Sequence, residues 1–226
     1  MIFDLIRNGL SFDLVINVGV RLLFIIFLLP VHEFAHAYVA TKLGDPTAKN
    51  MGRLTLNPLA HIDPFGSLLM LFAGFGYAKA VPVNIRNFRP ESRKRNMALI
   101  AFAGPLSNIF MAFIFATAYF IVIKSSNGYP SGFASNLASI FIIATQCNVS
   151  LAVFNLLPIP PLDGSRIMSI ILPNKYYYKI MQYERYIVLG VFVLILTGAL
   201  DAPISLISRL ILNGIYNVLS LIFGIG

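Results

Sequence analysis

Residues 12–40 read FDLVINVGVRLLFIIFLLPVHEFAHAYVA, and this stretch decides what kind of protein the chain is. Its apolar run is long enough to cross a bilayer core of roughly 30 Å. The run ends in three ionisable side chains, His32, Glu33 and His36, which are costly inside a membrane unless they have a function. Pro30 lies just before them and predicts a kink or loosened hydrogen bonding in the helix. We therefore expect a membrane-spanning helix that carries a functional site.

The composition of the whole chain agrees with a membrane protein. Of its 226 residues, 58% are hydrophobic and 12% are charged, which is too little charge to coat a soluble domain of this length. The further apolar windows, at 97–123, 133–157, 186–200 and 204–224, predict an all-α polytopic membrane protein with about five to six transmembrane helices. Residues 66–83 are apolar but broken by glycines and a proline, and they predict a small re-entrant or β-like element after the first motif helix.

The sequence shows no internal repeat and no soluble appendage, so we expect one membrane-embedded domain over residues 1–226. Its catalytic core is expected over about residues 12–172, and residues 173–226 are expected to form C-terminal accessory helices. Residues 204–224 carry a polar stripe, which leaves open whether this segment spans the membrane or lies at its surface. The single cysteine, Cys147, excludes an internal disulfide and a cysteine-rich zinc site.

The distribution of basic residues predicts how the chain is oriented in the membrane. The net charge of +8 comes from 17 Lys and Arg against 9 Asp and Glu, and it is densest in residues 84–96. Basic loops favour the cytoplasmic side, where they also meet anionic lipid headgroups. We therefore expect 41–65, 84–96 and 158–183 to be cytoplasmic, 124–132 to face outward, and the histidine pair to lie toward the cytoplasm in a multi-pass cell-membrane protein. The sequence contains no separate basic domain of the kind that would indicate nucleic-acid binding.

The segment His32-Glu33-Phe34-Ala35-His36 has the pattern H-E-x-x-H. Residues four apart share a helix face, so both imidazoles can reach one metal ion, and Glu33 can take a proton from an attacking water. Zinc suits nitrogen and oxygen ligands in this arrangement, and one Zn²⁺ per chain is expected. The competing interpretation is a polar cluster that only ties helices together. The third histidine, His61, is expected to make a local hydrogen bond in a connector.

Two imidazoles leave a catalytic zinc site one protein ligand short. Asp163 is the better candidate, because it closes the stretch 155–164, NLLPIPPLDG, whose three prolines forbid a regular helix and form a stiff arm. Gly164 lets the chain turn after the carboxylate. Asp45 remains open as an alternative, since it follows His36 by nine residues and could fold back, although Gly-Asp-Pro is also an ordinary turn.

The motif H-E-F-A-H together with N-x-x-P-x-P-x-L-D-G resembles the two signature motifs of the site-2 protease family, the intramembrane zinc metalloproteases. The chain is similar to the compact prokaryotic form of this family, which has no PDZ or CBS domain. The resemblance implies that His32, His36 and Asp163 bind the metal and that Glu33 is the general base. It also implies that Asn155 contacts the substrate or the developing oxyanion.

The resemblance covers about residues 14–172 and includes matches between the two signature motifs. Residues 44–47, GDPT, and 52–58, GRLTLNP, look like the connector of the compact members. Residues 103–108, AGPLSN, look like the motif of the family's third helix. The two signature motifs occur here without a gap, which makes their joint match specific.

The expected function is hydrolysis of a peptide bond within or next to a substrate transmembrane segment, as in regulated intramembrane proteolysis. The expected partners are a transmembrane protein or peptide substrate and the lipid bilayer, and a regulatory membrane partner is unknown. The alternative is a membrane metal-ion transporter that uses the same histidine and aspartate site. Transport favours several weak sites along a path, whereas this sequence concentrates its candidate ligands in one place.

Overall fold

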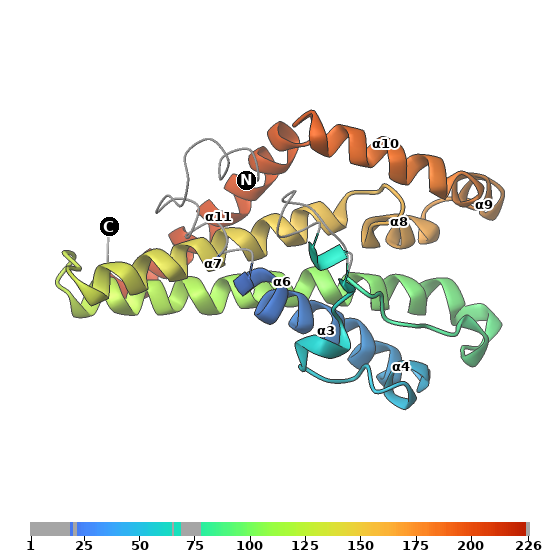
Figure 1. Ribbon diagram of the computed structural model, residues 1–226, viewed down its shortest axis with the longest axis horizontal. Helices are drawn as coiled ribbons and strands as arrows, with labels where there is room; N and C mark the ends of the chain where they lie inside the picture. Colours follow the sequence, from blue (N-terminus) through green and yellow to red (C-terminus); the bar gives the residue numbers. More distant parts are fainter. Residues whose placement is uncertain (1–18, 20–21, 65, 69–77, 225–226) are drawn as a thin grey trace. The chain divides into compact units, whose positions relative to one another are not determined.

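The computed structural model describes residues 19, 22–64, 66–68 and 78–224 (Figure 1). These residues form helices joined by turns and loops, and no strand occurs among them. The all-α fold class predicted from the sequence is therefore confirmed. The chain divides into two compact units, Met1–Asn96 and Met97–Gly226, and each is described by itself.

The first unit holds the helix with the H-E-x-x-H motif, followed by short helical turns and connectors. Its described elements are the π-helical turn η1 (Phe24–Leu28), α3 (Leu29–Lys42), α4 (Thr47–Asn50), and the 3₁₀ turns η2 (Pro58–Ala60), η3 (Ile85–Asn87) and η4 (Pro90–Ser92). Asn57 and Asn84 cap two of these turns, because their side chains accept hydrogen bonds from the backbone two residues on.

The second unit holds the longer helices. It contains most of α6 (Arg93–Ser125), then α7 (Phe133–Leu156), the short α8 (Asp163–Ile167), the turn η5 (Met168–Ile170), α9 (Asn174–Gln182), α10 (Glu184–Leu196) and α11 (Asp201–Phe223). The first four residues of α6 are basic or polar, and they belong to the segment that the sequence analysis assigned to a cytoplasmic loop.

Four helical segments of the described chain are long and apolar enough to cross a membrane: Phe24–Lys42, Pro90–Ser125, Phe133–Leu156 and Asp201–Phe223. The last of these corresponds to the segment with the polar stripe, so its length permits a span. The expected span at 186–200 forms α10 instead, whose 13 residues reach only about 20 Å along the helix axis. The expected re-entrant element at 66–83 lies mostly outside the described residues, and residues 78–83 form an irregular connection.

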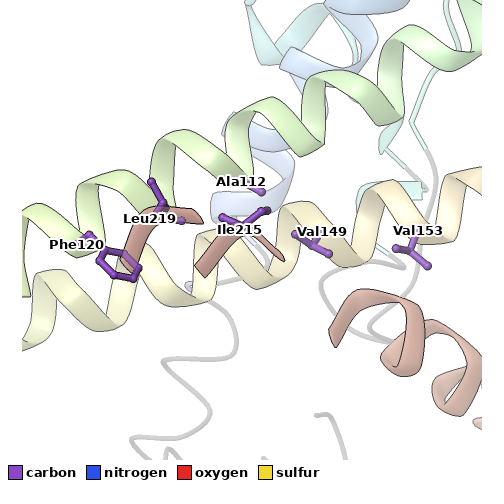
Figure 2. Packing of buried hydrophobic residues seen from close by; sticks show 7 residues of the cluster. Ala112, Phe120, Val149, Val153, Ile215 and Leu219 are labelled. Carbon is purple, nitrogen blue, oxygen red and sulfur yellow. The ribbon is translucent and has the colours of Figure 1, made fainter. Parts of the chain in front are cut away.

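Helices α6, α7 and α11 build the core of the second unit (Figure 2). Its buried members are Ala112, Ala116, Phe120, Val149, Val153, Ile215 and Leu219. The two alanines are one turn apart on α6, and small residues at this spacing let helix backbones approach closely. At the end of the core, the Lys124 ammonium donates a 2.9 Å hydrogen bond to the carbonyl of Phe223, which places a cation at the C-terminus of α11.

Candidate metal centre

Helix α3 begins with an irregular turn just before the H-E-x-x-H motif. The N–H of Leu29 donates to the carbonyl of Phe24, five residues earlier, and Pro30 is the second residue of α3. Since proline has no N–H to give, the preceding turn widens from the α to the π pattern. The irregularity predicted at Pro30 is therefore confirmed. Such turns frequently lie at functional sites, because they change which way the following side chains point.

The two motif histidines lie against each other on α3. Their Nε2 atoms are 3.0 Å apart, and the ring centroids are 4.6 Å apart with the ring planes at 85°. Two nitrogens at zinc-bonding distance on a tetrahedral ion would be separated by about 3.3 Å. Both side chains are buried. The nitrogens of His32 and His36 are therefore close to the spacing that one zinc ion needs, and the residues present fit a zinc ion.

Glu33 is buried next to this pair, with 8% of its surface exposed. A carboxylate is expensive to bury without a partner or a task. Glu33 follows His32 directly, so it lies beside the face that carries both imidazoles and not on it. In that position a carboxylate can exchange a proton with a water near the imidazoles without replacing either as a ligand.

Asp163 and Asn155 belong to the second unit, on either side of the proline-rich arm. Helix α7 ends at Leu156, and α8 begins at Asp163. Between them the chain makes tight backbone bonds, such as Leu162 N–H to the Ile159 carbonyl at 2.9 Å. Asp163 is half-buried, at the first position of α8, where the partial positive charge of a helix N-terminus favours a carboxylate. The expectation that the arm before Asp163 is non-helical is confirmed.

Gly164 fixes how closely α8 approaches the end of α7. A Cβ atom at this position would lie 2.2 Å from the carbonyl oxygen of Leu156 and 2.4 Å from that of Leu157. Both neighbours are backbone atoms and cannot move aside like a side chain. Glycine is required here for close backbone approach, whereas the sequence predicts only a turn at this position.

Asn155 is half-buried in the last turn of α7, and its amide donates a 3.1 Å hydrogen bond to the carbonyl of Leu151. An amide nitrogen carries two hydrogens, and this bond uses one of them. The contact with the preceding turn fixes the side-chain direction. A donor fixed in this way is suited to stabilise a developing negative charge.

Asp45 is fully buried, and both of its oxygens accept hydrogen bonds. Oδ1 accepts from the N–H of Thr47 at 3.1 Å, from the Thr47 hydroxyl, and from the Asn87 amide at 2.6 Å. Oδ2 accepts from the N–H of Asn84 at 2.7 Å. Burial acts to raise the pKa of Asp45, but these hydrogen bonds outweigh it and hold the pKa below its ordinary value. Asp45 thus ties the end of α3 to a segment about forty residues on, which favours a structural role over metal binding.

Two further polar residues hold the connector of the first unit, and only one of them, His61, is predicted from the sequence. Arg53 is buried and donates through Nη2 to the carbonyls of Lys79 and Ala80. His61 is also buried, donates through Nε2 to the Thr55 carbonyl at 2.8 Å, and accepts at its own carbonyl from Lys79 N–H at 2.9 Å. The local bond predicted for His61 is confirmed. No local pattern signals Arg53, because its acceptors are 26 and 27 residues away.

Comparison with known proteins places this chain among peptidases. The sequence profile of peptidase family M50 matches residues 121–198. YwhC of Bacillus subtilis, whose name designates a zinc metalloprotease, is 47% identical over 160 residues, which cover 69% of this chain and 70% of the relative. Rip2 of Mycolicibacterium smegmatis, also named as a zinc metalloprotease, is 29% identical over 192 residues, which cover 81% of this chain and 70% of the relative.

A third relative comes from an archaeon. MJ0611 of Methanocaldococcus jannaschii carries a zinc metalloprotease name and is 32% identical over 154 residues, which cover 66% of this chain and 71% of the relative. No solved structure matches the chain. The bacterial relative at 47% identity and the archaeal one at 32% each align over more than two thirds of their own length, so the likeness extends well beyond a short motif. The chain belongs to peptidase family M50.

Proposed function

We propose that this protein is an intramembrane zinc metalloprotease that hydrolyses a peptide bond within or next to a substrate transmembrane segment. The observation that carries the proposal is the buried pair of imidazoles, with Nε2 atoms 3.0 Å apart, on a helix long and apolar enough to span a membrane. Ionisable groups at such positions are functional by default, because burying them is costly. The membrane setting limits the substrate to chains that reach the bilayer.

In the proposed site, His32, His36 and Asp163 hold one Zn²⁺, which supplies Lewis acidity when bound. The two imidazoles and one carboxylate form a ligand set of the kind that catalytic zinc sites use. The names of the three relatives, all designating zinc metalloproteases, support the choice of metal. Among the three proposed ligands, the assignment of Asp163 rests most strongly on the resemblance to the site-2 protease family.

Glu33 is the proposed general base. It takes a proton from the attacking water as the new carbon–oxygen bond forms, and it passes that proton to the leaving amine. Asn155 is proposed to donate a hydrogen bond to the carbonyl oxygen of the substrate as negative charge develops there. Burial strengthens both contributions, because the interactions act in a medium of low dielectric constant.

We propose that the site lies toward the cytoplasmic side of the membrane. His36 lies six residues before Lys42, the last residue of α3, which is about 9 Å along the helix axis. Beyond that end, the connectors and the first turn of α6 carry most of the basic residues of the first unit, and basic segments next to spans favour the cytoplasm. Water would then reach the site from the cytoplasm.

The proposed substrate is a transmembrane segment that unwinds locally. A helix engages each scissile carbonyl in an intrahelical hydrogen bond, so cleavage requires that bond to open first. This requirement is typical of regulated intramembrane proteolysis, and the bilayer is the medium that presents the substrate. We also propose that residues 12–172 form the catalytic core and that 173–226 are accessory to catalysis within one domain.

The decisive experiment compares the wild type with Glu33→Gln, purified in detergent and incubated with model transmembrane substrates. Both proteins should contain zinc, and only the wild type should cleave, with a loss on the order of at least a hundredfold in the variant. Glu184→Gln, the same chemical change at the start of α10, is the matched control and should cleave normally. Metal flux into liposomes that persists in Glu33→Gln, with no cleavage by any variant, would contradict the protease proposal and support a metal-ion transporter.

A further inference from the structure

A cavity of about 620 Å³ lies within the first unit, away from the motif histidines. Its lining includes Lys42, Phe88, Arg89, Glu91 and Arg95. This volume falls in the range of roughly 300–1,000 Å³ that is typical of small-molecule sites. The proposed function uses none of these residues.

The charge of the lining favours an anion. The lining holds three cations, Lys42, Arg89 and Arg95, and one carboxylate, Glu91, and all four side chains are exposed to solvent. The ammonium of Lys42 lies 5.5 Å from the centre of the Tyr38 ring, a cation–π contact that limits where its charge can go. Two guanidinium groups and an ammonium together provide the planar and point-like donors with which proteins bind phosphate.

The cavity lining also contains buried side chains. Phe88 and Asn96 are buried, and the Asn96 amide donates to the Ser92 hydroxyl at 3.4 Å. Arg95 and Asn96 also belong to the first turn of α6, a helix of 33 residues, whose N-terminal end carries a partial positive charge. The fold therefore adds its own positive potential to that of the side chains.

The ends of two candidate spans place the cavity at the level of lipid headgroups. The span Phe24–Lys42 ends at Lys42, and the span Pro90–Ser125 begins beside Glu91. Both terminal turns line the cavity. Since a span ends where the hydrocarbon core gives way to headgroups, the lining cations lie where lipid phosphates are most concentrated.

We propose that this cavity binds a phosphate group, as carried by the headgroup of an anionic phospholipid. Lys42 and Arg95 would contact the phosphate from α3 and α6, and Arg89 would contact it from the turn between them. Asn87 also lines the cavity and holds Asp45 through a 2.6 Å hydrogen bond. A bound phosphate would thus brace the end of α3, the helix that carries the motif histidines. A soluble phosphate ester offers the same chemistry, and the experiment separates the two sources.

The test is a titration of the full-length protein in detergent with dioleoyl phosphatidylglycerol, with bound lipid counted by native mass spectrometry. Dioleoyl phosphatidylcholine, inorganic phosphate and glycerol 3-phosphate are titrated in parallel. Lys42→Gln and Arg95→Gln should each weaken phosphatidylglycerol binding roughly fivefold, because each removes one charge-assisted contact. The matched controls are Lys49→Gln and Arg86→Gln, which remove exposed cations of the same unit that do not line the cavity.

A second variant keeps the test independent of damage to the fold. Glu91→Gln removes the one carboxylate of the lining and should tighten phosphatidylglycerol binding, a result that misfolding cannot produce. Equal losses in the cavity variants and their controls, or equal affinity for the zwitterionic lipid, would overturn the proposal. If glycerol 3-phosphate binds with the same dependence on Lys42 and Arg95 and displaces the lipid, the site stands and its ligand is soluble.

Discussion

Asp45 follows a single glycine and Asp163 follows a proline-rich stretch, and the two carboxylates differ in what surrounds them. Asp45 is fully buried, and both its oxygens accept hydrogen bonds from Thr47, Asn84 and Asn87. Asp163 is half-buried at the start of a five-residue helix, behind a stiff arm. A carboxylate whose acceptors are occupied by amides and a hydroxyl is poorly suited to bind a metal as well. The contacts of Asp45 thus weaken the alternative that the sequence left open.

We expect the stability of the protein to depend on the ionisation of Asp45. Its folded-state pKa lies below the ordinary value of about 3.9, so its contribution to stability is fully present above that pH. The contribution is lost as the pH falls through the lowered folded-state pKa. Asp45→Asn should destabilise the protein at pH 7 by about 1–3 kcal/mol, because an amide cannot accept at both positions.

The measurement for Asp45 is the thermal unfolding midpoint by circular dichroism, from pH 7 down to pH 3. Other carboxylates and the histidines also titrate in this range, so the informative quantity is the difference between wild type and Asp45→Asn. That difference should shrink below about pH 4. A difference that stays constant across the whole range would show that the charge of Asp45 contributes nothing.

At the scale of elements, the arm between α7 and α8 depends on a close approach of two backbones. Gly164 allows it, because any Cβ there would overlap the carbonyl oxygens of Leu156 and Leu157. Asp163 precedes Gly164 directly, so the position of its carboxylate depends on this contact. The same reasoning gives a physical role to the glycine that ends the motif, because the close approach requires the absence of a side chain.

Gly164→Ala should lower the unfolding midpoint and reduce cleavage, because α8 must move away from α7 and take Asp163 with it. Overpacking against backbone is expected to cost about 1–3 kcal/mol or more. The matched control is Gly190→Ala in α10, where an added Cβ meets nothing within 4 Å. That change should be neutral or slightly stabilising, since alanine favours a helix. Equal unfolding midpoints for the two variants would contradict the requirement for glycine at position 164.

Helix α11 contributes more to the second unit than the term accessory suggests. Ile215 and Leu219 lie in the same buried cluster as residues of α6 and α7 (Figure 2). In contrast, Leu221 is 84% exposed, as expected for a side chain that faces lipid. The helix thus has one face packed on protein, and the accessory role proposed for it concerns catalysis and not stability.

At the scale of the whole molecule, the proposed zinc ligands come from parts of the sequence more than 120 residues apart. Asp163→Ala should therefore lower the zinc content measured by atomic emission after dialysis, and His36→Ala should lower it further. Asp45→Asn should retain zinc, because Asp45 is engaged in the connector. Full zinc occupancy in Asp163→Ala combined with zinc loss in Asp45→Asn would reverse the assignment of the third ligand.

Much of the fold was predictable from local pattern. The long apolar segments gave helices close to the predicted limits, as at Phe133–Leu156, because hydrophobic length alone decides whether a segment can span a bilayer. The segment at 186–200 was an exception, since its helix ends at Leu196, ahead of Gly198 with its positive φ of 70°. A hydropathy window does not register that single left-handed residue, which ends the helix.

The sequence by itself determined the features on which the proposed chemistry rests: two histidines and a glutamate in one apolar helix, a proline-rich arm that ends in Asp163, and a membrane setting. Such features are local, because helix periodicity and backbone restriction act over a few residues. Only the tertiary structure decided that the carboxylate oxygens of Asp45 accept hydrogen bonds from Asn84 and Asn87, and that residue 164 must lack a side chain. The hydrogen bonds of Asp45 join residues about forty positions apart, and the contact of Gly164 depends on how the chain between α7 and α8 folds back, so neither follows from a local pattern.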